Sequence, residues 1–161
     1  ATANVRVLTA LSKCDYIILG PGDLYTSLIP NLLVDGVSDA IVASSAPIIF
    51  IMNLMTKKGQ TTNYTAEDHL KDIEKYLKKK VDIVLMNNQK IPDNIINYYT
   101  ASDEKQVKDN LKKWEHTHDI IYASLISDTI HQQSKNDFAT RSIVRHDSDK
   151  LAEAIQKIII H

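Results

Sequence analysis

The chain has 161 residues, of which 43% are hydrophobic and 24% are charged, and these proportions fit one soluble domain or a large part of one. Its net charge of −1 lacks the positive excess with which proteins attract nucleic acid or anionic lipid. The single cysteine, Cys14, excludes an intrachain disulfide framework and a cysteine-rich zinc site.

The apolar runs and the first residues predict a cytoplasmic protein. No apolar run approaches the ~20 residues that span a bilayer. Residues 1–6 lack the basic start and apolar stretch of a secretory signal peptide. We therefore expect neither a membrane partner nor a nucleic-acid partner.

The first third of the chain predicts short helices around one strand. Asn4 is a candidate cap for a helix over residues 5–11. Residues 16–19 form a short apolar run that is typical of a buried strand. Residues 24–34 favour a helix with a kink or restart at Pro30.

The middle of the chain contains the most strongly marked helix. Gly36 precedes a further helical segment, and residues 48–52 predict a second buried strand. Thr65 and Asp68 then have the spacing of a capping box. The helix that follows has an apolar face formed by Leu70, Ile73 and Leu77. Its predicted charge pairs are Glu67–Lys71 and Glu74–Lys78, and the lysines of residues 78–80 close its C-terminal end.

The last half of the chain continues the alternation. Residues 81–86 and 120–126 predict two further strands, and the apolar positions between 107 and 114 predict a helix between them. Residues 127–142 are polar and without periodicity, which predicts a long loop. Asp147 is a candidate cap for a last helix.

The predicted strands are continuous apolar runs instead of alternating ones. This pattern is typical of strands that are covered on both faces. We therefore expect one α/β unit with a mostly parallel sheet and helices on both faces. No linker or internal repeat divides the chain.

Ligands of open α/β sheets bind beyond the carboxyl ends of the strands, and two such ends are polar here. After the first strand, residues 20–22 form a Gly-Pro-Gly turn from which a helix leaves, so that backbone N–H groups face one point. Thr26 and Ser27 add hydroxyl donors, and phosphate is the natural ligand. The spacing matches neither the dinucleotide-binding fingerprint nor the P-loop, and a plain strand–helix turn is the alternative.

The second polar end covers residues 53–64. It is rich in amides and hydroxyls, and Gly59 permits a tight turn. Such groups read a base or a sugar, whereas the alternative is a solvated loop. Beside it, Asp68 and His69 open the capped helix, and His69 is either an acid–base or ligand contact or a surface residue.

Other clusters favour structure over chemistry. His116 and His118 have a spacing at which metal binds, but no third ligand is apparent, so we expect no metal site. Trp114 and residues 98–99 are expected in the core or an interface, and residues 78–80 at a solvated helix end. No catalytic set of nucleophile and base is evident.

Three motifs, in order along nearly the whole chain, resemble the YvcK/CofD-like family. They are the run from Gly20 to Leu33, the run Asn53-Leu54-Met55-Thr56 with Gly59, Thr61, Tyr64 and Asp68-His69, and the run Val144-Arg145-His146-Asp147 with Lys150-Leu151-Ala152. The resemblance implies a Rossmann-like fold and a ligand that contains phosphate. The family also begins with a Gly-rich segment that is absent before Asn4, so we expect residues 1–161 to be the C-terminal portion of one family domain.

Two branches of the family imply different functions. The Leu-Tyr-Thr-Ser and Asn-Leu-Met-Thr runs resemble the YvcK branch, the gluconeogenesis factors. That branch implies a regulator of gluconeogenic growth, cell shape and envelope synthesis that binds UDP-sugars such as UDP-N-acetylglucosamine, without established catalysis or a required cofactor. The other branch implies a transferase that moves a phospholactyl group onto a deazaflavin.

The resemblance also implies site residues. The phosphate-side loop would be Gly20, Pro21, Gly22, Asp23, Tyr25, Thr26 and Ser27, with Asn31 supporting it or contacting the ligand. The second wall would be Asn53, Met55, Thr56, Gly59, Thr61 and Tyr64, with Asp68 and His69 behind it. Two positions depart from the family, because many relatives have Ser in place of Asp23 and often Glu in place of Gln60.

Three hypotheses follow for function. The chain is part of a nucleotide-sugar-binding regulator, part of a phospholactate-type transferase, or a half-domain that is inactive without its N-terminal part. The expected partners are a small nucleotide ligand, the missing N-terminal half and, from the resemblance, a second copy in a homodimer.

Overall fold

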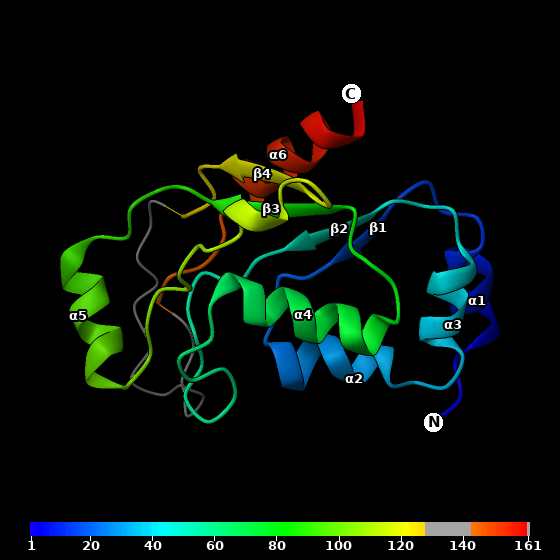
Figure 1. Cartoon of the computed structure of the whole chain (residues 1–161), viewed down its shortest axis with the longest axis horizontal. Coiled ribbons are helices and arrows are strands. Elements are labelled where there is room, and N and C mark those ends of the chain that lie inside the picture. Colours follow the sequence, from blue (N-terminus) through cyan, green and yellow to red (C-terminus); the bar gives the residue numbers. More distant parts are fainter. Residues whose placement is uncertain (128–142, 161) are drawn as a thin grey trace.

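The computed structural model describes residues 1–127 and 143–160 (Figure 1). In this part of the chain four parallel strands form one sheet, and their order in space follows their order in sequence. They are β1 (Ile17–Leu19), β2 (Ile48–Ile51), β3 (Ile83–Asn87) and β4 (Asp119–Ala123). The predicted α/β fold with a parallel sheet is confirmed.

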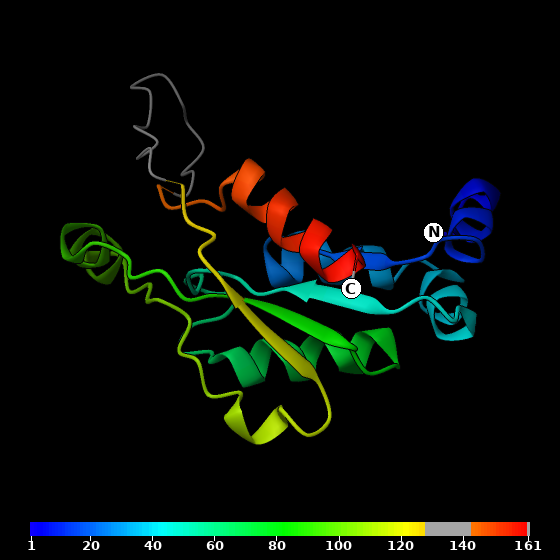
Figure 2. The same cartoon turned by 90° about the horizontal axis from the view of Figure 1, so that it is seen from above.

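Helices cover both faces of this sheet. They are α1 (Val5–Leu11), α2 (Ile29–Leu32), α3 (Val37–Ala43), α4 (Ala66–Leu77), α5 (Asp93–Ala101) and α6 (Ser148–Ile160). α2 and α4 lie on one face, and α6 crosses the other (Figures 1 and 2). α1 and α3 pack beside the amino ends of the strands, whereas α5 stands beyond their carboxyl ends (Figure 1).

The strand β2 is the centre of the core. Its four residues are 0–1% exposed. Ile48 and Phe50 pack in one apolar cluster with Leu70 of α4, and Ile51 packs in another cluster with Ala154 of α6. Because both faces of β2 are covered, its sequence has to be a continuous apolar run.

The predicted capping box at the start of α4 is confirmed. The Thr65 backbone N–H donates to Asp68 Oδ2 at 2.8 Å, and the Asp68 N–H donates to Thr65 Oγ1 at 3.4 Å. The apolar face is also as predicted, since Leu70, Ile73 and Leu77 are each 0% exposed. The cap therefore sets where α4 begins, and the apolar face sets which side meets the sheet.

The predicted pair Glu74–Lys78 does not form. Lys78 ends α4 with a left-handed backbone (φ 61°), and its amino group lies 3.3 Å from Asp39 Oδ1. Glu74 Oε1 instead accepts hydrogen bonds from the Val81 N–H at 2.9 Å and from His118 Nε2 at 2.8 Å. His118 is 4% exposed, so it joins α4 to the segment before β4.

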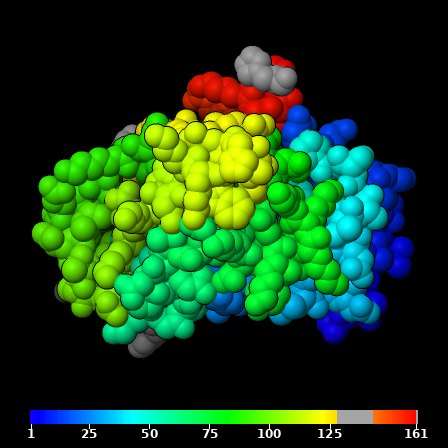
Figure 3. All heavy atoms as spheres, viewed as in Figure 1, coloured from blue at the N-terminus to red at the C-terminus, as the bar shows by residue number. Residues whose placement is uncertain are grey.

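The prediction of a helix over residues 107–114 is wrong. Only a short turn, η2 (Lys112–Trp114), is helical, and α5 was not predicted. Val107 and Leu111 are buried because their segment runs extended beside the loop after β2, where the Val107 N–H donates to Leu54 O at 3.0 Å. This segment covers the middle of the face seen in Figure 3.

Two expectations about exposure also need correction. β1 lies at the edge of the described sheet, so only Ile17 is buried and Ile18 is 43% exposed, contrary to the prediction of a buried strand. The lysine run is not wholly solvated, because Lys79 Nζ donates to the Ser44 carbonyl at 2.7 Å. That carbonyl lies at the end of α3, where cations are favourable.

The helix predicted over residues 24–34 consists of a π-helix, η1 (Leu24–Leu28), that runs into α2, with Pro30 in the first turn of α2. Asp147 caps α6 as predicted, since its Oδ1 accepts the N–H groups of Asp149 and Lys150 at 3.0 Å. The predicted loop 127–142 lies outside the described residues, apart from Ser127. Within the described ranges no helix has both the length and the apolar character that crossing a membrane requires.

Loss of the α4 cap should measurably destabilise the fold. We expect Thr65→Ala to lower the free energy of unfolding by about 1–2 kcal/mol, because the backbone N–H of Asp68, in the first turn of α4, loses its acceptor. Urea denaturation measures the change. Thr100→Ala is the control, since that exposed hydroxyl bonds only the Ile96 carbonyl of its own helix. Equal losses in the two variants would contradict the prediction.

Candidate functional site

The two polar strand ends meet at the carboxyl edge of the sheet. A cavity of about 340 Å³ lies there, and we call it the edge cleft. It is lined by residues 21–23 after β1, residues 53–57 after β2, Glu104 after α5, and residues 144–146 before α6. Four segments far apart in sequence thus converge where open α/β sheets bind their ligands.

The first position of the Gly-Pro-Gly turn strongly favours glycine. Gly20 has φ +93°, which is left-handed backbone, and a Cβ added to it would lie 3.2 Å from the Ile51 carbonyl oxygen. The turn is then fastened to the second loop, because Asn53 Nδ2 donates to the Gly22 carbonyl at 2.9 Å. The two predicted loops are therefore joined into one wall.

Several predicted residues of the first loop lie on η1 and α2 rather than in the cleft lining. Thr26 Oγ1 donates to Asp23 Oδ2 at 3.4 Å, and Asn31 Nδ2 donates to the Ser27 carbonyl at 2.6 Å. Both bonds stabilise the helical segment that leaves the turn. Contact of Thr26, Ser27 and Asn31 with a ligand remains a prediction.

In the second loop, Asn53, Met55 and Thr56 line the edge cleft, whereas the other predicted residues shape the loop. Thr56 Oγ1 accepts the Lys105 N–H at 2.8 Å, and Thr61 Oγ1 accepts the Lys57 N–H at 2.8 Å. Both threonines are buried. Gly59 lies in a turn with φ +77°.

Behind the wall, Tyr25 of η1, Tyr64 and Asp72 of α4 form a hydrogen-bonded cluster. The Tyr25 and Tyr64 hydroxyls are 2.9 Å apart, and both donate to Asp72 Oδ2. Burial, followed by the bonds to Asp72 and Tyr64, raises the pKa of Tyr25 above its ordinary value. Tyr25 therefore stays protonated and acts as a tie between η1 and α4.

Asp68 and His69 also serve the fold at this place. Asp68 is held in the capping box, and this bonding lowers its pKa. His69 is 0% exposed, contrary to the reading of a surface residue, and its Nδ1 lies 2.9 Å from the Thr65 carbonyl. Its Nε2 is buried without a partner among the described residues.

Six lining residues are not among the predicted site residues: Leu54, Lys57, Glu104, Val144, Arg145 and His146. Lys57 and Glu104 form an ion pair of 3.2 Å, in which the Glu104 side chain is 12% exposed. Arg145 lines the cleft, and the guanidinium groups of arginine suit phosphate. The only signal for Arg145 and His146 was their place in the third family motif.

Two buried polar atoms of the cleft lining have no hydrogen-bond partner among the described residues. They are Asn53 Oδ1 and His146 Nε2. Burial lowers the pKa of His146, and a hydrogen bond to the Met52 backbone partly opposes this. Buried polar atoms are normally satisfied, so unpaired ones in a cleft indicate a binding surface.

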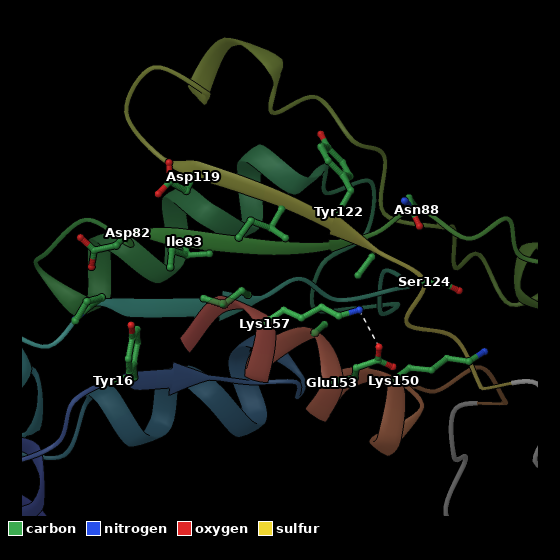
Figure 4. Close-up of a pocket in the computed structure, with 15 residues that line it drawn as sticks. Tyr16, Asp82, Ile83, Asn88, Asp119, Tyr122, Ser124, Lys150, Glu153 and Lys157 are labelled. Atoms are coloured by element: carbon green, nitrogen blue, oxygen red, sulfur yellow. Dashed lines mark hydrogen bonds and ion pairs between the residues drawn. The ribbon is translucent and has the colours of Figure 1, made fainter. Parts of the chain in front are cut away.

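A larger cavity, the sheet groove, of about 1050 Å³, lies between α6 and the faces of β3 and β4 (Figure 4). Asp82 and Asp119 lie at one end of it, and Asn88 and Ser124 lie at the other (Figure 4). The strands thus place polar groups at both ends of the groove, with apolar residues such as Ile121 between them, and α6 adds Lys150, Glu153 and Lys157. Convergent polar groups mark a binding site, so the edge cleft is the stronger candidate.

Comparison with known proteins decides the family. The model of the family described as 2-phospho-L-lactate transferase CofD matches residues 1–126. The chain belongs to the CofD family. The resemblance read from the three motifs is confirmed.

Relatives within this family carry the name gluconeogenesis factor. The protein of that name from Bacillus subtilis is 31% identical over 155 residues, which cover 96% of this chain and 46% of that protein. The one from Halalkalibacterium halodurans is 36% identical over 149 residues, which cover 92% of this chain and 43% of that protein. The chain spans about half the length of these relatives, as is consistent with the C-terminal part of a family member.

A solved structure has the same fold. A crystal structure of a Bacillus halodurans protein matches 96% of this chain and 47% of its own length, with a TM-score of 0.82 and 32% identity. This match supports the Rossmann-like assignment of the fold.

The glycine requirement of the Gly-Pro-Gly turn can be tested against a matched glycine. We expect Gly20→Ala to lower the free energy of unfolding by about 2–4 kcal/mol, because it adds a tight contact with the Ile51 carbonyl oxygen to the cost of a positive φ. Gly59→Ala has a similar φ but no atom within 4 Å of the new Cβ, so about 1 kcal/mol is expected there. Denaturant unfolding of both variants measures the difference. A loss at position 59 equal to that at position 20 would refute the argument.

Burial of histidines should make the protein acid-sensitive. Burial lowers the folded-state pKa of His69 below its ordinary value of 6.5. Below about pH 6.5 the unfolded chain therefore binds protons that the folded chain does not, and the free energy of unfolding falls by up to about 1.4 kcal/mol per pH unit for such a histidine. We expect His69→Gln to flatten the stability curve between about pH 6.5 and 5, measured by urea unfolding. The exposed His116→Gln is the control, and parallel curves for all three proteins would disprove the effect.

Proposed function

We propose that this chain contributes the edge cleft to a regulatory protein that binds a nucleotide sugar of the UDP-N-acetylglucosamine type. The observation that carries the proposal is the bond from Asn53 to the Gly22 carbonyl, which joins two family motifs into one cleft at the carboxyl edge of the sheet. The relatives named gluconeogenesis factor support a role in gluconeogenic growth. A regulatory role in cell shape and envelope synthesis is part of the proposal, and it rests on the resemblance to the YvcK branch.

The chemistry of the cleft supports such a ligand. Its volume of about 340 Å³ is at the lower end of the ~300–1,000 Å³ of small-molecule sites. The backbone N–H of Gly22 in the Gly-Pro-Gly turn and the guanidinium of Arg145 are donors that suit phosphate oxygens. The carboxylate of Asp23 repels phosphate, and we assign it a sugar hydroxyl instead.

The chain's share of its relatives limits what it does alone. It spans about half of their length, and we propose that an N-terminal half supplies the rest of the binding site, opposite the wall formed by the two loops of this chain. That half is the first partner we propose, and a homodimer is the second.

A second candidate function is a transferase of the phospholactate type. It is favoured by the family model, which is described as 2-phospho-L-lactate transferase. An assay with a phospholactyl donor and a deazaflavin acceptor decides this point. Absence of product from a full-length protein would leave the regulatory function as the better one.

Calorimetric titration tests the nucleotide-sugar proposal. UDP-N-acetylglucosamine is titrated into this chain and into a protein extended to the full length of its relatives. We expect saturable binding by the extended protein and weaker or no binding by the chain alone, because part of the contact surface is then missing. Failure of both proteins to bind would overturn the proposed function. Equal affinity would show that the edge cleft is sufficient.

A further inference from the structure

The unpaired atoms of the edge-cleft residues are both hydrogen-bond acceptors. The Nδ2 of Asn53 donates a hydrogen bond to the Gly22 carbonyl at 2.9 Å, and this bond fixes the orientation of the amide group. The Oδ1 of Asn53 is then left as a hydrogen-bond acceptor. The two buried atoms without a partner among the described residues, Asn53 Oδ1 and His146 Nε2, belong to residues that line the same cavity.

The same reasoning assigns the protons of His146. The backbone N–H of Met52 already donates to the Leu85 carbonyl at 3.0 Å, so the Met52 group that hydrogen-bonds the His146 ring is the carbonyl oxygen. Since Nε2 is the nitrogen without a partner, Nδ1 carries the proton of that bond. In a neutral imidazole the other nitrogen is then an acceptor. Both unpaired atoms therefore accept hydrogen bonds.

The position of His146 is set by its backbone rather than by its ring. Its residue pairs with Ile126 in an antiparallel bridge, and the preceding N–H groups of Ile143 and Val144 donate to the Tyr99 hydroxyl at 2.8 and 3.0 Å. Tyr99 is 3% exposed, so this anchor is fixed in a core cluster. The side chain of His146 is thus held at the cleft without a structural task beyond the bond to Met52.

We propose that Asn53 and His146 are specificity-determining residues that accept hydrogen bonds from the hydroxyl groups of a sugar ring of the ligand. Ionised phosphate oxygens only accept hydrogen bonds, so they cannot pair with Asn53 Oδ1 and His146 Nε2, which are acceptors too. The phosphates of the ligand are therefore expected at the Gly-Pro-Gly turn instead. A sugar ring, ribose or hexose, supplies the donors. This inference rests on the proposed function, and it adds the direction in which the ligand lies.

Two substitutions of His146 separate its two nitrogens. Asn places an amide near the position of Nδ1 and can keep the bond to Met52, whereas Gln reaches the position of Nε2. We expect His146→Asn to weaken UDP-N-acetylglucosamine binding about tenfold, since one hydrogen bond to the ligand is lost. We expect His146→Gln to stay within about threefold of the parent protein. The exposed His116→Asn is the control and should bind as the parent does.

Calorimetry at pH 7.5 in EDTA, with whichever form of the protein binds, measures these affinities, and urea unfolding checks that the variants are folded. Titration with UDP distinguishes the two sources of hydroxyls. An equal loss for UDP and for UDP-N-acetylglucosamine assigns the donors to ribose, and a loss for the sugar nucleotide alone assigns them to the hexose. Unchanged affinity in His146→Asn, or equal losses in both variants, would overturn the inference alone. Absence of binding by the parent protein would overturn the proposed function as well.

Discussion

The complete burial of β2 is the constraint on which the rest of the structure depends. A parallel strand with both faces covered needs a neighbour on each side, and β1 and β3 pair with it in register at Ile49–Ile18 and Ile49–Ile83. The covering layers then have to be α4 and α2 on one face and α6 on the other (Figure 2). Once the strands run parallel, their carboxyl ends share one edge, and the edge cleft is a consequence of that alignment.

Hydrogen bonds within the chain hold the loop after β2 that lines the edge cleft. Thr56 and Thr61 use their hydroxyls to bond backbone N–H groups, and Asp68 is held by Thr65. These groups hold the loop after β2, and Asn53 then ties it to the Gly-Pro-Gly turn. Asn53 Oδ1 and His146 Nε2 are the unpaired buried atoms that belong to residues of the cleft lining, among the residues that the structure describes.

Much of the fold was predictable from local patterns. The apolar run at residues 48–52 and the capping box at Thr65 specify their elements within a few residues, and both were confirmed. The prediction of a helix over residues 107–114 failed, because the same spacing of apolar residues also arises in an extended segment that buries Val107 and Leu111 against a distant loop. His69 likewise was read as a surface residue, since no local signal shows that α4 turns that side toward Tyr64.

By itself the sequence determined the family, the parallel α/β class and the two polar strand ends, because these depend on short runs whose chemistry is local. Only the tertiary structure decided which of the polar residues share a cavity. Glu104 and His146 come from segments whose own sequence does not place them beside Asn53. They reach the cleft through long-range backbone pairing, of residue 106 with Met55 and of His146 with Ile126. Such pairing is a property of the packed chain, since its partners are separated by tens of residues or by a whole layer of the fold.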